Sequence, residues 1–271
     1  MEKTLLRPPK ERLRKDTDGE KMNQKRIVLI AAIVMLFMCQ FGFGQYRDHF
    51  VFSQLKYRGG SWNLYPSSFA EIINMLITTT SIKPELRRND IALTDKALFI
   101  TPFLWMTGDV PFDEFNAEEL RILRQYLLCG GLIVIDDASG NRNIGFDKSA
   151  RDLVKTLFPE NKLEKIPEDH AIFRSFYLLR EVGGRKIVNR YLEGITIDKR
   201  LVLIYSQNNI YSAWARDQLG NWLYECVPGG ELQRMEAMKL TVNIIMYSLT
   251  GDYKKDLVHK QYIEDKLRLI Y

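Results

Sequence analysis

The feature that most constrains this fold is a short apolar run at residues 132–135, followed directly by Asp136 and Asp137. A continuous run of this length, rich in β-branched residues, is typical of a strand covered on both faces, as in a parallel sheet. Residues 97–105 have a similar composition and are predicted to form a neighbouring strand. The chain is therefore expected to contain at least two central strands of a buried sheet.

A helix is predicted between these two strands, over residues 116–129. Asn116 is a favourable N-cap, Glu119 three residues later completes a capping box, and Gly130 follows the last turn. Strand, helix and strand in this order form a right-handed parallel crossover. The predicted fold class is α/β, a mostly parallel, doubly wound sheet in a single domain after an apolar leader. Cys129, at the end of the helix, is expected to be buried.

The rest of the chain is predicted to supply further strands and helices around this crossover. Strands are expected over residues 50–57, 91–93, 201–205 and 211–214, and helices over residues 66–77 and 146–158. A last long helix follows Gly230 and stops at Gly251. Its predicted inward face carries Leu232, Met235, Met238, Val242, Ile245 and Leu249.

The net charge of +5 is concentrated at the N-terminus. Residues 1–26 hold nine basic and five acidic side chains, and residues 27–44 hold no charge. The remainder has 30 basic against 29 acidic residues. A nearly neutral folded part gives no basic surface for a phosphate backbone, so no nucleic-acid partner is predicted.

The N-terminal 44 residues have the pattern of an export segment. Residues 27–43 are almost wholly apolar, Lys25 and Arg26 precede them, and Gly42 and Gly44 stand where a signal peptidase requires small residues. The alternatives are a cleaved signal peptide, with Met22 as the true start, and an uncleaved membrane anchor. Both leave residues 45–271 outside the cytoplasm, as a periplasmic or membrane-anchored protein. The predicted organisation is a leader over 1–44, a domain over 45–251 and a charged, helical tail over 252–271.

Several motifs, in order along the chain, resemble the bacterial family known as domain of unknown function four-one-five-nine. They lie at residues 56–62, 103–108, 130–137, 169–173, 205–209 and 242–247. Ala171 replaces the family's usual proline, and Asn209 replaces its usual acid. The resemblance covers residues 50–251 and implies a flavodoxin-like or class I glutamine-amidotransferase-like fold, with a relation to trehalose-utilisation-type proteins. It implies no established activity, and members often belong to exported, membrane-anchored proteins.

Polar loops follow the predicted strands, and in doubly wound sheets ligands bind beyond the carboxyl ends of the strands. These loops comprise residues 58–62, 107–109, 136–140 and 205–209, which the turn at 169–170 is expected to join. The candidate acid–base residues are Asp136, Asp137 and His170. The candidate binding residues are Arg58, Gly59, Gly60, Trp62, Thr107, Gly108, Tyr205, Asn208 and Asn209.

The usual catalytic motifs are missing from these loops. Ser139 lacks the preceding glycine of a nucleophile elbow, and Cys129 stands before the strand instead of after it. Gly59 and Gly60 lack phosphate-loop spacing. With three histidines and no CxxC pair, a zinc site is poorly supported, so neither a metal nor a cofactor is predicted. Asp136 and Asp137 have an alternative role as caps of the following turn, and His170 as a turn residue bonded to backbone.

Two functions from different classes follow from these patterns. The first is a non-catalytic binding or assembly module outside the cytoplasm, with envelope proteins or a small polar ligand as partners and the membrane as a further partner if the leader is uncleaved. The second is an enzyme acting on a small polar or carbohydrate-like ligand, with Asp136 or Asp137 and His170 as acid–base or metal groups. The missing nucleophile favours the first, and the convergent polar loops favour the second.

Overall fold

A computed structural model describes residues 49–250 of the chain. The predictions made for the leader over 1–44 and for the tail over 252–271 lie outside the described residues. Within the described range no helix combines the length and the apolar content needed to cross a membrane.

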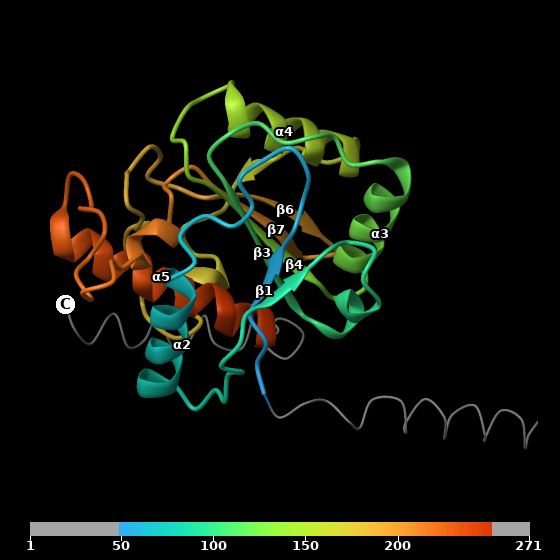
Figure 1. Ribbon diagram of the computed structural model, residues 1–271. Coiled ribbons are helices and arrows are strands. Elements are labelled where there is room, and N and C mark those ends of the chain that lie inside the picture. Colours follow the sequence, from blue (N-terminus) through green and yellow to red (C-terminus); the bar gives the residue numbers. More distant parts are fainter. Residues whose placement is uncertain (1–48, 251–271) are drawn as a thin grey trace, which may run out of the picture. The chain divides into compact units, whose positions relative to one another are not determined.

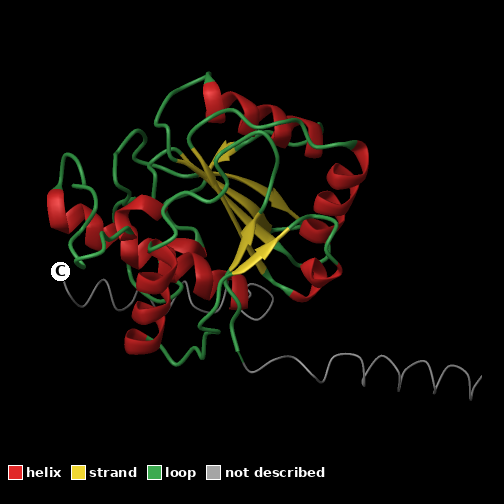
Figure 2. Cartoon of the chain, in the orientation of Figure 1, coloured by secondary structure: helices red, strands yellow, loops and turns green. Residues whose placement is uncertain are grey.

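The described part is an α/β domain with one seven-stranded sheet in the order β2-β1-β3-β4-β7-β6-β5 (Figures 1 and 2). The first five strands in this order are parallel, and β6 and β5 are antiparallel to their neighbours. The strands are β1 (Ser53–Leu55), β2 (Asn89–Ile91), β3 (Phe103–Gly108), β4 (Leu132–Asp137), β5 (Glu164–Lys165), β6 (Glu193–Ile197) and β7 (Arg200–Ser206). The α-helices are α2 (Ser68–Thr79), α3 (Ala117–Leu128), α4 (Gly145–Leu157) and α5 (Gly230–Thr250). Three 3-10 helices are η1 (Lys96–Ile100), η2 (Ala171–Phe173) and η3 (Tyr211–Trp214).

Helices cover both faces of the sheet, and each face has its own apolar core. Helices α2 and α5 pack with η3 on one face, and α3 and α4 lie on the other (Figure 1). In β4, Val134 belongs to the first core, whereas Ile133 and Ile135 belong to the second. The alternation of side chains along the strand explains this division. It also explains why the whole run is buried, as the sequence predicts.

The central crossover forms as predicted, with a shorter first strand. The Asn116 side chain accepts the Glu119 N–H, and the Glu119 carboxylate accepts the Asn116 N–H, both at 2.9 Å. Strands β3 and β4 pair over six residues, from Phe103 opposite Leu132 to Gly108 opposite Asp137. The prediction of a strand from residue 97 is wrong, because residues Lys96–Ile100 form η1. Pro102 has no N–H to donate, and the ladder begins directly after it.

Several other predictions are wrong in detail. Residues Tyr211–Trp214 form a 3-10 helix, η3, instead of a strand. Cys129 is exposed and Cys226 is buried, both as free thiols. The strand expected over 50–57 is confined to Ser53–Leu55. Strand β6 has no counterpart among the predicted elements.

The inward face of α5 differs from the predicted one near both ends of the helix. Leu232 and Met235 are 76% and 50% exposed, and Leu249 is 41% exposed. Gln233 and Arg234 are buried in their place. Arg234 donates to the carbonyls of Ala213 and Tyr224, at 2.6 and 2.7 Å. Tertiary hydrogen bonds to loop carbonyls therefore orient this helix, which an apolar pattern does not reveal.

The parallel strands end together at one edge of the sheet, which we call the carboxyl edge. The chain leaves β1 toward β2 on one side and continues from β3 to β4 and β7 on the other. The ends of β1 and β3 therefore lie where the winding direction changes. In open α/β sheets this is the position at which ligands bind.

Candidate functional site

Asp136 is wholly buried at the carboxyl edge, and each oxygen of its carboxylate accepts a backbone N–H group at the start of η3. Its two carboxylate oxygens accept the backbone N–H groups of Ile210 and Tyr211, at 2.9 and 2.8 Å. Burial raises the pKa of Asp136 to about 7, against the effect of these two hydrogen bonds. The carboxylate therefore caps a 3-10 helix 74 positions later in the chain, and not the following turn that the sequence offered as its structural role.

Asp137 points to the other face of the sheet, toward α4. Its Oδ1 accepts the Ser139 N–H at 2.7 Å, as a strand-end aspartate does when it closes a turn. Its Oδ2 is buried and has no hydrogen-bond partner among the described residues. Burial raises the pKa of Asp137 to about 6, and the nearby charge of Asp147 adds to the rise.

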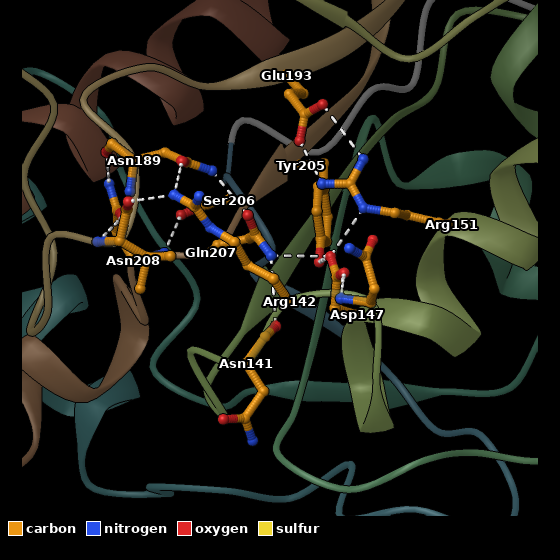
Figure 3. Close-up of polar contacts among 12 residues, drawn as sticks. Asn141, Arg142, Asp147, Arg151, Asn189, Glu193, Tyr205, Ser206, Gln207 and Asn208 are labelled. Atoms are coloured by element: carbon orange, nitrogen blue, oxygen red, sulfur yellow. Dashed lines mark hydrogen bonds and ion pairs between the residues drawn. The ribbon is translucent and has the colours of Figure 1, made fainter.

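A hydrogen-bonded network surrounds Asp147 of α4 (Figure 3). The Asp147 side chain is wholly buried. Its Oδ1 accepts from Arg151 Nε at 2.9 Å, from Gln207 Nε2 at 2.9 Å and from the Tyr205 hydroxyl. Its Oδ2 accepts the Asn143 N–H at 2.6 Å. With four donors inside a wholly buried side chain, this carboxylate is already paired within the protein.

The same network continues in two directions from Asp147. Arg151 binds Glu193 of β6 through both terminal nitrogens, at 3.2 and 2.7 Å (Figure 3). Gln207 accepts from the Asn189 side chain at 2.7 Å, and Asn189 accepts from Arg142 at 2.6 Å. These contacts tie α4, β6, β7 and two loops together. The members of the network bind one another, and the network therefore stabilises the fold.

The predicted binding residues at 58–62 are engaged in packing the loop after β1. Arg58 binds the Glu119 carboxylate at the start of α3, at 3.0 Å. Gly59 has a φ of +75°, and a Cβ there would lie 2.7 Å from the Asp113 backbone N. A Cβ on Gly60 would meet the Tyr57 ring at 2.6 Å. The two glycines thus allow the loop after β1 to lie close to the loop after β3. Trp62 accepts a hydrogen bond on its carbonyl from the Gln54 side chain.

The predicted binding residues on β3 and β7 are likewise internal. Thr107 donates to the Asp136 carbonyl at 3.0 Å, and its own carbonyl accepts the Tyr57 hydroxyl at 2.7 Å. A Cβ on Gly108 would lie 2.2 Å from that hydroxyl. Asn208 accepts the Val188 and Asn189 N–H groups, at 2.9 and 3.0 Å. Tyr205 belongs to the network around Asp147 described above.

The structure does not bring His170 to the two aspartates. Its Nδ1 accepts the Ile172 N–H at 3.2 Å, and its ring lies 5.4 Å from the Tyr247 ring of α5. The Tyr247 hydroxyl accepts the N–H of Leu201, at the beginning of β7. His170 therefore lies toward the amino end of that strand, whereas Asp136 and Asp137 end β4 at the carboxyl edge.

A second group of polar side chains gathers around Tyr65, on the loop between β1 and α2. We call it the Tyr65 cluster; its members are Tyr65, Asp109, Arg185, Asn209 and Tyr224. The Tyr65 and Tyr224 rings are 5.4 Å apart in an edge-to-face contact, and the Arg185 guanidinium lies 4.6 Å over the Tyr224 ring. Burial raises the pKa of Tyr65, a hydrogen bond with the Asn209 side chain lowers it, and the charges of Arg185 and Asp109 also act on it.

The Tyr65 cluster lies at the ends of three strands. Asp109 directly follows β3, and Asn209 is the third residue after β7. Asn209 Nδ2 donates to the Ala138 carbonyl at 3.3 Å, and the Ala138 N–H donates to the Gly108 carbonyl at 2.8 Å. This line of bonds joins the ends of β7, β4 and β3. Tyr65 and Asn209 both adopt left-handed backbone conformations, with φ of +50° and +52°. Non-glycine residues in this region are strained and are often found at ligand sites.

Three buried polar atoms in the Tyr65 cluster have no hydrogen-bond partner among residues 49–250. They are Asp109 Oδ1, Asn209 Oδ1 and Arg185 Nε. A buried polar atom without a partner costs about 1–3 kcal/mol, and more if it is charged. These three atoms are therefore candidates for contact with a ligand. The described residues contain no group of three histidine, cysteine, aspartate or glutamate side chains able to hold a metal ion.

Sequence reasoning found part of this cluster. Asp109 and Asn209 belong to the strand-end loops that the fold class predicts to be polar. Tyr65, Arg185 and Tyr224 lie in connecting loops without a motif, and tertiary packing brings them together. Asp147 and Arg151 of the internal network were missed too. Their spacing on α4 is that of a helical ion pair, which is more often exposed than buried.

Comparison with known proteins gives one family match. The family model described as Domain of unknown function (DUF4159) matches residues 51–249. A search of curated proteins found no match.

Proposed function

We propose that this chain, which belongs to the DUF4159 family, is a non-catalytic binding or assembly module. The observation that supports this proposal is the engagement of the reactive side chains at the carboxyl edge. The Asp136 carboxylate is occupied by two backbone N–H groups, and the Asp147 carboxylate by four donors. General acid–base catalysis needs a group that can exchange a proton with a substrate.

The proposal includes a closer assignment of the fold. We infer a relation to flavodoxin-like and class I glutamine-amidotransferase-like folds, and through them to trehalose-utilisation-type proteins. The strand order β2-β1-β3-β4-β7 supports it, because it repeats the 2-1-3-4-5 order of flavodoxin-like sheets. The antiparallel pair β6 and β5 extends the sheet beyond that order.

We also propose that residues 45–271 act outside the cytoplasm, periplasmic or anchored to the membrane. The support is the uncharged run at 27–44 behind a basic segment. In that compartment the partners would be other envelope proteins or a small polar ligand.

A second function deserves a test because of Asp137. Its Oδ2 is buried without a partner, and burial raises its pKa to about 6. A carboxyl group with a pKa near the working pH suits a general acid or base. The second candidate is therefore an enzyme acting on a small polar or carbohydrate-like ligand through Asp137. His170 lies near the amino end of β7 and therefore has no role in this second candidate function.

One experiment separates the two candidates. The purified full-length protein is incubated with a small-molecule extract of bacterial cells, and each compound is quantified by mass spectrometry in the free and the bound fraction. A binding module retains a compound up to one molecule per chain and leaves its total amount unchanged. Heat-denatured protein is the control for non-specific retention.

Turnover would contradict the proposal. Loss of one compound and appearance of another, in molar excess over the protein, would establish the enzyme. If the Asp137→Asn variant then abolishes turnover and Asp113→Asn, an exposed aspartate, does not, the acid–base role belongs to Asp137. If no compound is retained, the proposal is reduced to an assembly module that binds other envelope proteins. Cross-linking in intact cells tests that function.

A further inference from the structure

We propose that the Tyr65 cluster binds a small zwitterion, such as a free α-amino acid or a short peptide, through its ammonium and carboxylate groups. This inference rests on the proposed binding function and assigns a site and a ligand class to it. The observations that carry it are the three unpartnered polar atoms, the opposite charges of Asp109 and Arg185, and the stacking of Arg185 on Tyr224.

The unpartnered atoms define which ligand groups fit. Asp109 Oδ1 and Asn209 Oδ1 are acceptors, so the ligand must bring donors to them. Arg185 Nε is a donor, so the ligand must bring an acceptor to it. An ammonium has three donors and a carboxylate two acceptor oxygens. One molecule with both groups satisfies all three atoms.

The charges of the cluster favour a zwitterion over an ion of one sign. Asp109 follows Gly108, whose carbonyl is joined through Ala138 to Asn209, and the Arg185 N–H donates to the Asn209 carbonyl. No ion pair between Asp109 and Arg185 is present in the described part of the chain. A ligand with a single charge would pair with one of them and repel the other. A ligand with separated opposite charges pairs with both, and charge-assisted hydrogen bonds are about twice as strong as neutral ones.

The cluster is held in place before a ligand arrives. The Arg185 N–H donates to the Asn209 carbonyl at 3.1 Å, and its carbonyl accepts the Val227 N–H at 2.8 Å. Its guanidinium is stacked on Tyr224, which in turn packs against Tyr65. Asn209 itself is wholly buried. A preorganised site loses less entropy on binding and gains affinity for that reason.

Isothermal titration calorimetry on the full-length protein tests the ligand class. The probes are glycine, L-alanine and glycylglycine, against ethylamine and acetate as the separate charges and glycerol and glucose as neutral polyols. We expect at least one zwitterion to bind, and the single-charge probes and polyols to give no heat. Recovery of the bound zwitterion intact distinguishes this site from a catalytic one.

Variants then locate the site. Asp109→Asn and Arg185→Gln each remove one charge and are expected to weaken binding about tenfold or more, because a buried charge loses its partner. Glu114→Gln and Arg190→Gln remove the same charges from exposed positions and are expected to leave binding unchanged. Circular dichroism melting of each variant shows that it is folded.

Two results would overturn the proposal. The first is the absence of binding by folded wild-type protein to every zwitterion probe at about 10 mM, well above the usual range of small-molecule affinities. The second is binding that Asp109→Asn and Arg185→Gln leave unchanged, or binding of polyols alone. Conversion of a bound zwitterion to product would instead keep the site and contradict the non-catalytic function.

Discussion

The carboxylates of Asp136 and Asp137, adjacent at the end of β4, lie on opposite faces of the sheet. Asp136 accepts N–H groups from η3, on the face covered by α2 and α5. Asp137 accepts the Ser139 N–H, and the charge of Asp147 on α4 acts on it. The two carboxylates therefore have different hydrogen-bond partners on opposite faces of the sheet. A reaction that needs both carboxylates on one substrate has no support in this geometry.

The stability of the protein should depend on pH through Asp137. Burial raises the pKa of this carboxyl from 3.8 to about 6, so the folded state holds the proton more tightly than the unfolded chain. The free energy of unfolding therefore falls as the pH rises from about 4 to about 6. Asp137→Asn cannot ionise and keeps the acceptor for Ser139, so it should lose less stability over this range, by about 1–3 kcal/mol. Urea denaturation across the range measures this; parallel curves for wild type and variant would contradict the assignment.

Arg151 should be required for the stability of the protein, because it pairs with the buried carboxylate of Asp147. Arg151→Leu removes a donor from a wholly buried carboxylate and frees Glu193. The expected loss is about 3 kcal/mol, at the low end for breaking a buried pair because Arg151 is 33% exposed. Adding Asp147→Asn to Arg151→Leu should restore part of this loss, since the unpaired charge is then gone. Denaturant unfolding measures both variants, and equal stability of Arg151→Leu and wild type would show that the network contributes nothing.

Ile135 should be a centre of stability. It is wholly buried in β4, between Met106 of β3 and Tyr205 of β7. Ile135→Ala should cost about 2–5 kcal/mol through lost burial and the cavity left behind. Ile144→Ala, at a position 60% exposed, is the matched control and should stay within about 0.5 kcal/mol of wild type. An unchanged melting temperature for Ile135→Ala would be incompatible with its place in the sheet.

Gly183 should resist substitution because of its contact with α5. A Cβ at this position would lie 2.0 Å from the Ala237 backbone N, so the helix or the loop must move. Gly183→Ala should cost about 1–3 kcal/mol or more. Gly229→Ala makes the same chemical change 3.0 Å from the Gln233 Cβ, with no backbone atom closer than 3.8 Å, and should therefore cost less than Gly183→Ala. Thermal unfolding compares the two, and a larger loss for Gly229→Ala would refute the argument.

Export is testable with reporters fused after Tyr271. In a Gram-negative host, alkaline phosphatase, which needs an oxidising compartment, should be active. A reporter that needs the cytoplasm should be inactive in the same fusion. Replacing four apolar residues of 27–43 by charged ones should reverse both results. A cytoplasmic reporter that is active in the unaltered fusion would disprove export.

The sequence predicts the elements that carry a local signal in their own residues. Strand β4 and helix α3 are recognisable because an apolar run and a capping box are local signals. Strand β5 has two exposed charged residues and carries no such signal. The aromatic residues of η3 suggest a strand, but the Asp136 carboxylate binds the N–H groups of Ile210 and Tyr211 and holds that segment in a helical turn. That interaction spans 74 and 75 positions and has no signature in either segment.

The candidate site is predictable where it depends on strand ends and unpredictable where it depends on loops. The fold class implies that Asp109 and Asn209 reach the carboxyl edge. Arg185 reaches it because its backbone is bonded to Asn209 and Val227, a contact set by tertiary packing. His170 was expected at this edge, and its place beside Tyr247 depends on the path of η2 along α5.

The hydrogen bonds of Asp136 with Ile210 and of Asp147 with Tyr205 have a consequence for synthesis on the ribosome. Asp136 and Asp147 emerge well before Tyr205 and Ile210, which are 58 and 74 residues away from their partners. At about 5–20 residues per second, this interval is roughly 4–15 s for Asp136. During that time two carboxylates that end up wholly buried remain in water, and β4 has no β7 beside it. Completion of the sheet must therefore wait until Ser206, the last residue of β7, has been translated.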